Sequence, residues 1–198
     1  MSVPATEPTW DQKIVILADA FARAGLPYAF GGAIALNYYR EPRSTLDIDI
    51  NVFISPAERE AVVRALAKVF PIDDQPRVSE ELARDGQSRA RWGNTFVDLF
   101  LTSTALHEEM SSRTEQMPFG DRLIPILSIE DLLICKVLFD RTKDWLDFEA
   151  VVATGKRPLD SSYILAWLGR FLAQDDPRLE KARGILSAAG LENGRPAS

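Results

Sequence analysis

Two neighbouring stretches decide how this chain is interpreted: Phe30-Gly31-Gly32-Ala33 and, fifteen residues after the glycines, Leu46-Asp47-Ile48-Asp49-Ile50-Asn51-Val52. Successive side chains of a strand point to opposite faces, so we expect Asp47 and Asp49 on one face and the apolar side chains on the other. Two carboxylates this close repel and raise each other's pKa unless a cation lies between them. Mg²⁺ bound by one or two carboxylates keeps open positions for phosphates. The stretch therefore predicts a site for a metal-bound nucleotide.

The glycine pair lies between an expected strand and an expected short helix. Because glycine has no Cβ, the backbone at Gly31 and Gly32 can approach a phosphate closely, and the first N–H groups of the helix point to the same place. A Gly-Gly pair alone is a common turn, and its significance comes from its position ahead of the acidic pair. We predict that Gly31 and Gly32, with Ser44 or Thr45, contact phosphate.

A third aspartate, Asp98, lies between two apolar residues in a second expected strand, fifty-one residues after Asp47. The helix and hairpin between the two strands can bring them side by side, where opposed Cβ atoms are about 5 Å apart. Three carboxylates at such distances can enclose two metal ions, one that activates the nucleophile and one that holds the triphosphate. A lone Asp-x-Asp motif usually marks a solvated strand edge, and Asp98 is the residue that favours a metal site.

The hydrophobic periodicity predicts an α/β (α+β) fold, in which a mixed sheet is flanked by helices and followed by a helical C-terminal extension. Strands are expected at 26–30, 46–52, 95–101 and 122–127, with a weak strand pair or loop at 72–91. Helices are expected at 9–24, 33–39, 57–70, 104–112, 128–139, 143–154, 161–173 and 177–189. We place a catalytic core with its N-terminal helix at 1–127, a helical extension packed on it at 128–191, and a disordered tail at 192–198.

The composition argues against several other classes of protein. The chain has 198 residues and a net charge of −6, which disfavours a stable nucleic-acid binder but allows a local cationic groove. Its single cysteine, Cys135, excludes an internal disulfide framework, and its single histidine, His107, argues against a histidine-based metal site. The N-terminus shows no signal-peptide pattern, and no apolar run approaches ~18 residues. We therefore expect a soluble cytoplasmic protein without membrane association.

These residues together resemble the nucleotidyltransferase superfamily of the DNA polymerase β type. The resemblance rests on Gly31-Gly32, the approach segment Arg43-Ser44-Thr45, the Asp47-x-Asp49 motif and the later Asp98. It implies a nucleotidyltransferase-type sheet and the transfer of a nucleoside monophosphate from an NTP to an acceptor, with release of pyrophosphate. It also implies two Mg²⁺ ions: Asp47 and Asp49 would bind both, and Asp98 would bind the catalytic ion and help to deprotonate the acceptor hydroxyl.

A closer likeness is to the bacterial nucleotidyltransferase toxins of type IV toxin–antitoxin pairs, which add a lysine and an aspartate on C-terminal helices. The matching segments here are 129–136 and 141–147, and they contain Lys136 and Asp144. The resemblance implies that Lys136 steadies the triphosphate, that Asp144 has a catalytic role, and that an antitoxin partner exists. If the helix runs on, Lys143 and Asp147 share one stripe with Lys136 and Asp144, and Lys143 and Asp144 can pair.

Three alternatives remain open from the sequence. The acceptor is a tRNA, a protein or a small molecule. The segment between Gly32 and Asp47 is longer than in minimal members of the superfamily and is closer in length to that of tRNA nucleotidyltransferases and aminoglycoside nucleotidyltransferases. Arg40 and Arg43 either add positive charge beside the metal site or are ordinary loop arginines. A degenerate domain that binds nucleotide or a protein without turnover is the alternative to an enzyme, and the intact set of three aspartates argues against it.

Overall fold

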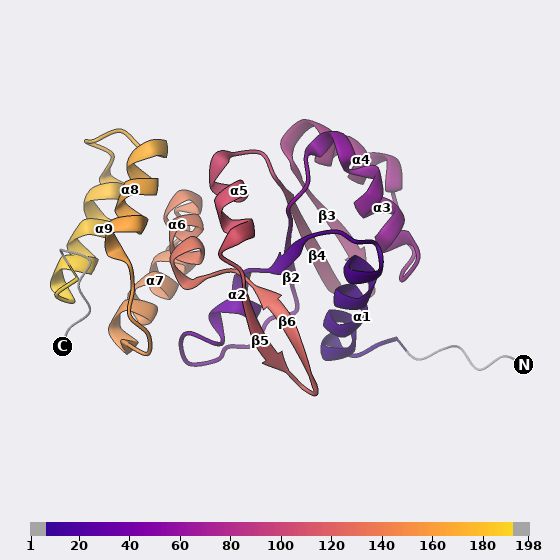
Figure 1. Cartoon of the computed structure of the whole chain (residues 1–198), viewed down its shortest axis with the longest axis horizontal. Helices are drawn as coiled ribbons and strands as arrows, with labels where there is room; N and C mark the ends of the chain where they lie inside the picture. Colours follow the sequence, from indigo (N-terminus) through magenta and orange to yellow (C-terminus); the bar gives the residue numbers. More distant parts are fainter. Residues whose placement is uncertain (1–6, 192–198) are drawn as a thin grey trace, which may run out of the picture. The chain divides into compact units, whose positions relative to one another are not determined.

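The computed structural model of the chain describes residues 7–191, and the tail predicted at 192–198 lies outside them. In chain order (Figure 1), the elements are α1 (Trp10–Arg23), β1 (Tyr28–Phe30), α2 (Gly32–Leu36), β2 (Ile48–Val52), the 3₁₀ helix η1 (Pro56–Glu58), α3 (Glu60–Ala67), α4 (Gln75–Asp85), β3 (Gln87–Trp92), β4 (Thr95–Leu101), α5 (Ala105–Ser112), β5 (Glu115–Phe119), β6 (Arg122–Ile126), α6 (Ile129–Phe139), α7 (Thr142–Thr154), α8 (Ser161–Phe171) and α9 (Pro177–Ala188).

The chain divides into two compact units. The first contains the residues up to Ile34 together with Ser44–Ile126, and the second contains Ala35–Arg43 and the residues from Leu127 onward. All the strands described above belong to the first unit, and α6 to α9 belong to the second. Segment 35–43, which the proposed division at 127 assigns to the core, therefore groups with the C-terminal helices.

Within residues 7–191 the strands form one six-stranded sheet in the order β3-β4-β2-β1-β6-β5. The strand β2 runs parallel to β4 and antiparallel to β1, and β1 runs parallel to β6. The outer strands β3 and β5 pair antiparallel with β4 and β6 (Figure 1). The predicted mixed sheet, its flanking helices and the helical C-terminal end are confirmed.

One face of the sheet in the first unit is apolar and covered by helices. Alternate residues of β2 and β4, including Ile48, Ile50, Val97 and Leu99, have no exposed surface. The helix α4 contacts β3 and β4, and α3 contacts both α4 and α1. Because side chains alternate along a strand, the residues between these apolar ones lie on the opposite face, where Asp49 and Asp98 are only half-buried.

The expectation for residues 72–91 was wrong in part, and one strand was missed. Instead of a weak strand pair or loop, this segment holds α4 followed by β3. The local signals for a helix are present: Asp74 caps its N-terminus, and Gly86 ends it with a φ of 67°. The missed strand β5 pairs with β6 through a hairpin at Gly120. Its five residues include Pro118 and are all at least partly exposed, so the strand signal is weak and pairing with β6 determines the strand.

The two separate helices predicted at 128–139 and 143–154 are confirmed, so the condition for a single stripe along one continuous helix is not met. The helix α6 ends at Asp140, which adopts a left-handed conformation with a φ of 54°, and Arg141 is extended before α7 begins. A left-handed residue terminates an α-helix because its carbonyl no longer continues the ladder. The residues on the two sides of the break therefore meet through tertiary packing between helices and not through helical spacing.

None of the helices within residues 7–191 combines the length and the apolar character that crossing a bilayer demands.

Candidate active site

The register of two parallel strands brings together two of the predicted carboxylates. Asp49 in β2 lies directly opposite Asp98 in β4. Neighbouring strands are about 4.8 Å apart, so the two side chains leave the same face of the sheet as immediate neighbours. The prediction that the Asp98 strand lies beside the Asp-x-Asp strand is confirmed.

Gly32 lies against the carboxylate of Asp49. Its φ is 49°, and a Cβ at this position would lie 1.9 Å from Oδ2 of Asp49 and 2.5 Å from its Cγ. The N–H of Gly31 donates to the backbone carbonyl of Asp49 at 2.9 Å, so this donor is engaged within the protein. The glycine pair therefore shapes the backbone around Asp49, which gives it a role independent of the predicted contact with phosphate.

Asp47 lies one residue before β2 and is fixed by a local turn. Its N–H donates to the Thr45 hydroxyl at 3.1 Å, and that hydroxyl is 3.3 Å from the Asp47 carbonyl oxygen. Such a hydroxyl-capped turn holds the backbone of a short loop in one conformation. The side chain of Thr45 thus orients the loop that carries Asp47, while the predicted phosphate contact of Ser44, an exposed residue, stays a prediction.

An arginine that the sequence analysis did not single out binds Asp98. Arg89 of the edge strand β3 lies opposite Asp98, and its guanidinium donates through Nε at 2.6 Å and Nη2 at 2.7 Å. The hydrogen bonds to Asp98 raise the pKa of Arg89, and the charges of Asp47 and Asp49 raise it further. The three predicted aspartates therefore act on one guanidinium. The alternation of Arg89 and Arg91 in β3 was the available sequence signal.

The predicted ligands are carboxylates, the type of side chain that a hard divalent cation binds, and Asp49 and Asp98 lie side by side on neighbouring strands. Carboxylate oxygens are the ligands that Mg²⁺ prefers. The carboxylate of Asp49 occupies the space that a Cβ on Gly32 would take, so the glycine leaves room for it. As they stand in residues 7–191, no three acidic, histidine or cysteine side chains are arranged to hold a metal ion. In this arrangement both oxygens of Asp98 accept from Arg89.

Lys136 lies in a buried cluster of charges in the second unit. Its Nζ is 2.9 Å from Oδ1 of Asp144 and 2.7 Å from Oδ2 of Asp147, and only 9% of the lysine side chain is exposed. Arg141 binds Asp144 at 2.6 Å, and Arg40 binds Asp147 at 2.8 Å. Cations thus outnumber carboxylates around these two aspartates.

The partners of Asp144 in this cluster differ from the predicted pair with Lys143, and Arg43 lies at the edge of the cluster. Lys143 is exposed, and Asp144 pairs with Lys136 and Arg141 in its place. Burial alone raises the pKa of Asp144, but hydrogen bonds from Arg141 and Lys136 outweigh it and hold the pKa below its usual value. Arg43 lies 3.5 Å from Asp147 and is held by two backbone hydrogen bonds to the side chain of Asn37.

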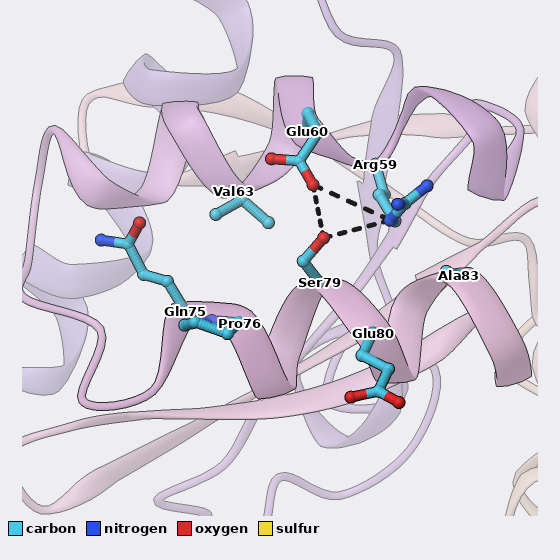
Figure 2. Close-up of a pocket in the computed structure, with 8 residues that line it drawn as sticks. All are labelled: Arg59, Glu60, Val63, Gln75, Pro76, Ser79, Glu80 and Ala83. Atoms are coloured by element: carbon cyan, nitrogen blue, oxygen red, sulfur yellow. Dashed lines mark hydrogen bonds and ion pairs between the residues drawn. The ribbon is translucent and has the colours of Figure 1, made fainter.

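A pocket in the first unit lies between α3 and α4 (Figure 2). The hydroxyl of Ser79 contacts the Glu60 carboxylate and accepts from Arg59 at 3.1 Å. None of the predicted site residues lines it, and its walls come from Arg59, Glu60, Val63, Gln75, Pro76, Ser79, Glu80 and Ala83. The acidic face is thus separate from this pocket, because α4 packs on the covered side of the sheet.

Comparison with protein families gives one match that covers most of the chain. The family described as "Nucleotidyl transferase AbiEii toxin, Type IV TA system" matches residues 15–189. No curated protein gives a significant match to the sequence.

Solved structures with a similar fold include nucleotidyltransferases. A solution structure of the antibiotic-resistance factor ANT(2'')-Ia is 14% identical, covers 95% of this chain and 100% of its own, and has a TM-score of 0.58. A crystal structure of ANT(2'')-Ia with adenylyl-2''-tobramycin is 15% identical, covers 83% and 97%, and has a TM-score of 0.59. An antigenic nucleotidyltransferase-like protein from Paracoccidioides brasiliensis is 17% identical, covers 91% and 94%, and has a TM-score of 0.51. These likenesses establish the fold.

Proposed function

The chain belongs to the AbiEii family of nucleotidyltransferase toxins of type IV toxin–antitoxin systems, and from this premise we propose that it uses Asp47, Asp49 and Asp98 to transfer a nucleoside monophosphate from a magnesium-bound NTP to an acceptor hydroxyl. A bond forms between the acceptor oxygen and the α-phosphorus, the bond to the β-phosphate oxygen breaks, and pyrophosphate leaves. The hydroxyl proton passes to Asp98. Membership of the family supports nucleotidyl transfer, and the metal, the acceptor and the residue roles are the proposal.

The observation that carries the proposal is the register of Asp49 against Asp98 beside Gly32. Two acidic side chains leave adjacent strands at the same level, and the glycine leaves room for one of them. Mg²⁺ bound here would neutralise the phosphates and lower the pKa of the attacking hydroxyl. Asp47 and Asp49 would supply ligand oxygens, and the turn at Thr45 would keep Asp47 in place.

Positive charge for the triphosphate is proposed to come from Lys136 and Arg43. The surplus of cations over carboxylates around Asp144 and Asp147 supports this assignment. Lys136 is already held by two carboxylates, so it would act as a fixed point charge. Asp144 is proposed to position Lys136, which replaces the direct catalytic role that the resemblance implies.

The acceptor is proposed to be a macromolecular hydroxyl, on a tRNA or a protein, with an antitoxin as the cellular partner. The experiment incubates the protein with each of four α-labelled NTPs and Mg²⁺ in the presence of total tRNA, total protein or a panel of aminoglycosides. Label that enters one pool identifies donor and acceptor together, and label in the aminoglycosides would contradict the macromolecular acceptor. Asp49→Asn should abolish transfer, whereas Asp121→Asn, a matched change at a fully exposed carboxylate, should not.

One observation favours a second candidate, a domain that binds nucleotide without turnover. Arg89 engages both oxygens of Asp98, the residue assigned to proton transfer. If no pool is labelled while Mg²⁺ and an NTP still raise the melting temperature of the wild type and not of Asp49→Asn, this second function replaces the first.

A further inference from the structure

The face of the sheet that carries the aspartates also carries a cation, which offsets part of their negative charge. Asp98 and Asp49 are adjacent, and repulsion between neighbouring carboxylates disfavours their simultaneous ionisation unless positive charge lies nearby. Arg89 supplies that charge through a two-pronged contact at 2.6 and 2.7 Å. It comes from the edge strand β3, in direct register with Asp98.

The Arg89 side chain is placed to leave Asp98 without a change in the sheet. It is 53% exposed, and its guanidinium lies 4.8 Å from the ring centroid of Phe96, where a cation is stabilised by the aromatic face. Beside it is a hollow whose charged lining residues are Asp73, Asp74, Arg77, Arg89 and Arg91. A guanidinium that left Asp98 would therefore remain at the exposed edge of the sheet, beside this hollow.

We propose that Arg89 is a counter-ion for the metal site. Arg89 binds the carboxylate of Asp98 while no metal is bound, and it releases that carboxylate when a divalent cation enters. The proposal rests on the proposed function, because it takes Asp98 as a metal ligand. Arg89 and the metal compete for two reasons. Both would bind the carboxylate of Asp98, and as like charges they would repel one another there. Arg89 is thus a positioning residue that sets the affinity for metal.

The test measures binding of Mn²⁺ alone by electron paramagnetic resonance, which counts the free ion, in the absence of nucleotide. Four proteins are compared: the wild type, Arg89→Gln, Arg91→Gln and Asp49→Asn. Arg91 is the matched control, because it lies two residues along β3 on the same exposed face and its guanidinium contacts the carbonyl of Gly93. Its substitution removes the same charge without touching Asp98.

We expect Arg89→Gln to bind Mn²⁺ about two- to tenfold more tightly than the wild type and Arg91→Gln to bind like the wild type. Binding detected only in Arg89→Gln would support the proposal equally. Unchanged or weaker binding in Arg89→Gln, with binding lost in Asp49→Asn, would overturn the competition and leave the metal site intact. If Asp49→Asn binds as well as the wild type, or if no protein binds, the metal assignment in the proposed function fails together with the competition.

A second readout separates this role from a purely structural one. Without metal, Arg89→Gln should melt at a lower temperature than Arg91→Gln, because the neighbouring carboxylates lose their counter-ion. Addition of Mn²⁺ should then raise the melting temperature of Arg89→Gln by more than that of the wild type. A loss of stability that Mn²⁺ does not restore would show that Arg89 only supports the fold, and would contradict the proposal.

Discussion

Replacement of Gly32 by alanine tests whether the glycine turn exists to accommodate Asp49. The new Cβ would lie 1.9 Å from Oδ2 of Asp49, and real Cβ contacts essentially never fall below 3.0 Å. The backbone of Gly31 is tied to the Asp49 carbonyl, so the main chain cannot easily retreat. The carboxylate must therefore move by at least about 1 Å, into another rotamer or away from the turn.

Two separate costs contribute to the expected loss of stability. A non-glycine residue at a φ of 49° costs roughly 1–2 kcal/mol in backbone strain. Displacement of the Asp49 side chain from its rotamer adds about 0.5–1.5 kcal/mol. Gly32→Ala should therefore lower the free energy of unfolding by about 1.5–3.5 kcal/mol. A misplacement of 1 Å at a reacting group costs on the order of 10²-fold in rate, and we expect a loss of this size in nucleotidyl transfer.

The matched control is Gly25→Ala. Gly25 has a similar φ of 65°, but no atom lies within 4 Å of the position that its Cβ would take. This variant isolates the backbone strain, so it should lose only about 1–2 kcal/mol and keep both Mn²⁺ binding and activity. Urea denaturation gives the unfolding free energies, and electron paramagnetic resonance gives the Mn²⁺ affinities.

If Gly32→Ala resembles Gly25→Ala in both measurements, Gly32 does not serve to accommodate Asp49. Equal losses of stability would mean that the Asp49 carboxylate yields without cost. Wild-type affinity for Mn²⁺ in a folded Gly32→Ala protein would mean that the position of Asp49 does not determine metal binding.

Three further changes test other parts of the molecule. Lys136→Met leaves Asp144 and Asp147 buried with one cation fewer, so the unfolding free energy measured in urea should fall by roughly 3–5 kcal/mol, and a loss below about 1 kcal/mol would contradict the role of this cluster. The pKa of Asp144 is lower in the folded state than in the unfolded chain, so its contribution to stability is complete above about pH 4. This contribution is lost as the pH falls through the pKa of the folded state. Asp144→Asn should therefore reduce the dependence of the unfolding free energy on pH below about pH 4. Thr45→Val leaves the N–H of Asp47 without its acceptor, which should cost about 0.5–1.5 kcal/mol in urea denaturation and weaken Mn²⁺ binding, and unchanged Mn²⁺ binding would show that this turn does not orient Asp47.

Much of the fold could be predicted because its signals are local. The alternation of Ile48, Asp49 and Ile50 defines a strand with one apolar face, and the capping residues Thr9 and Ser128 mark where two helices begin. The helix at 75–85 was missed because its sequence is mostly polar, although Asp74 and Gly86 mark its two ends. The strand at 115–119 carries almost no signal of its own, and its partner strand determines it.

Local patterns were enough to identify the acidic residues, the strand face of Asp49 and Asp98, and the glycine turn ahead of the Asp-x-Asp motif. Strand alternation and backbone freedom depend on neighbours along the chain, so both can be seen in the sequence. The contact between Arg89 and Asp98, and the contact between Lys136 and Asp144 across a break between helices, could be seen only in the folded structure. Both contacts depend on strand register and helix packing, which bring together residues that no local pattern relates. The charge partners of a site are therefore fixed by the fold, even where the site residues themselves are evident from the sequence.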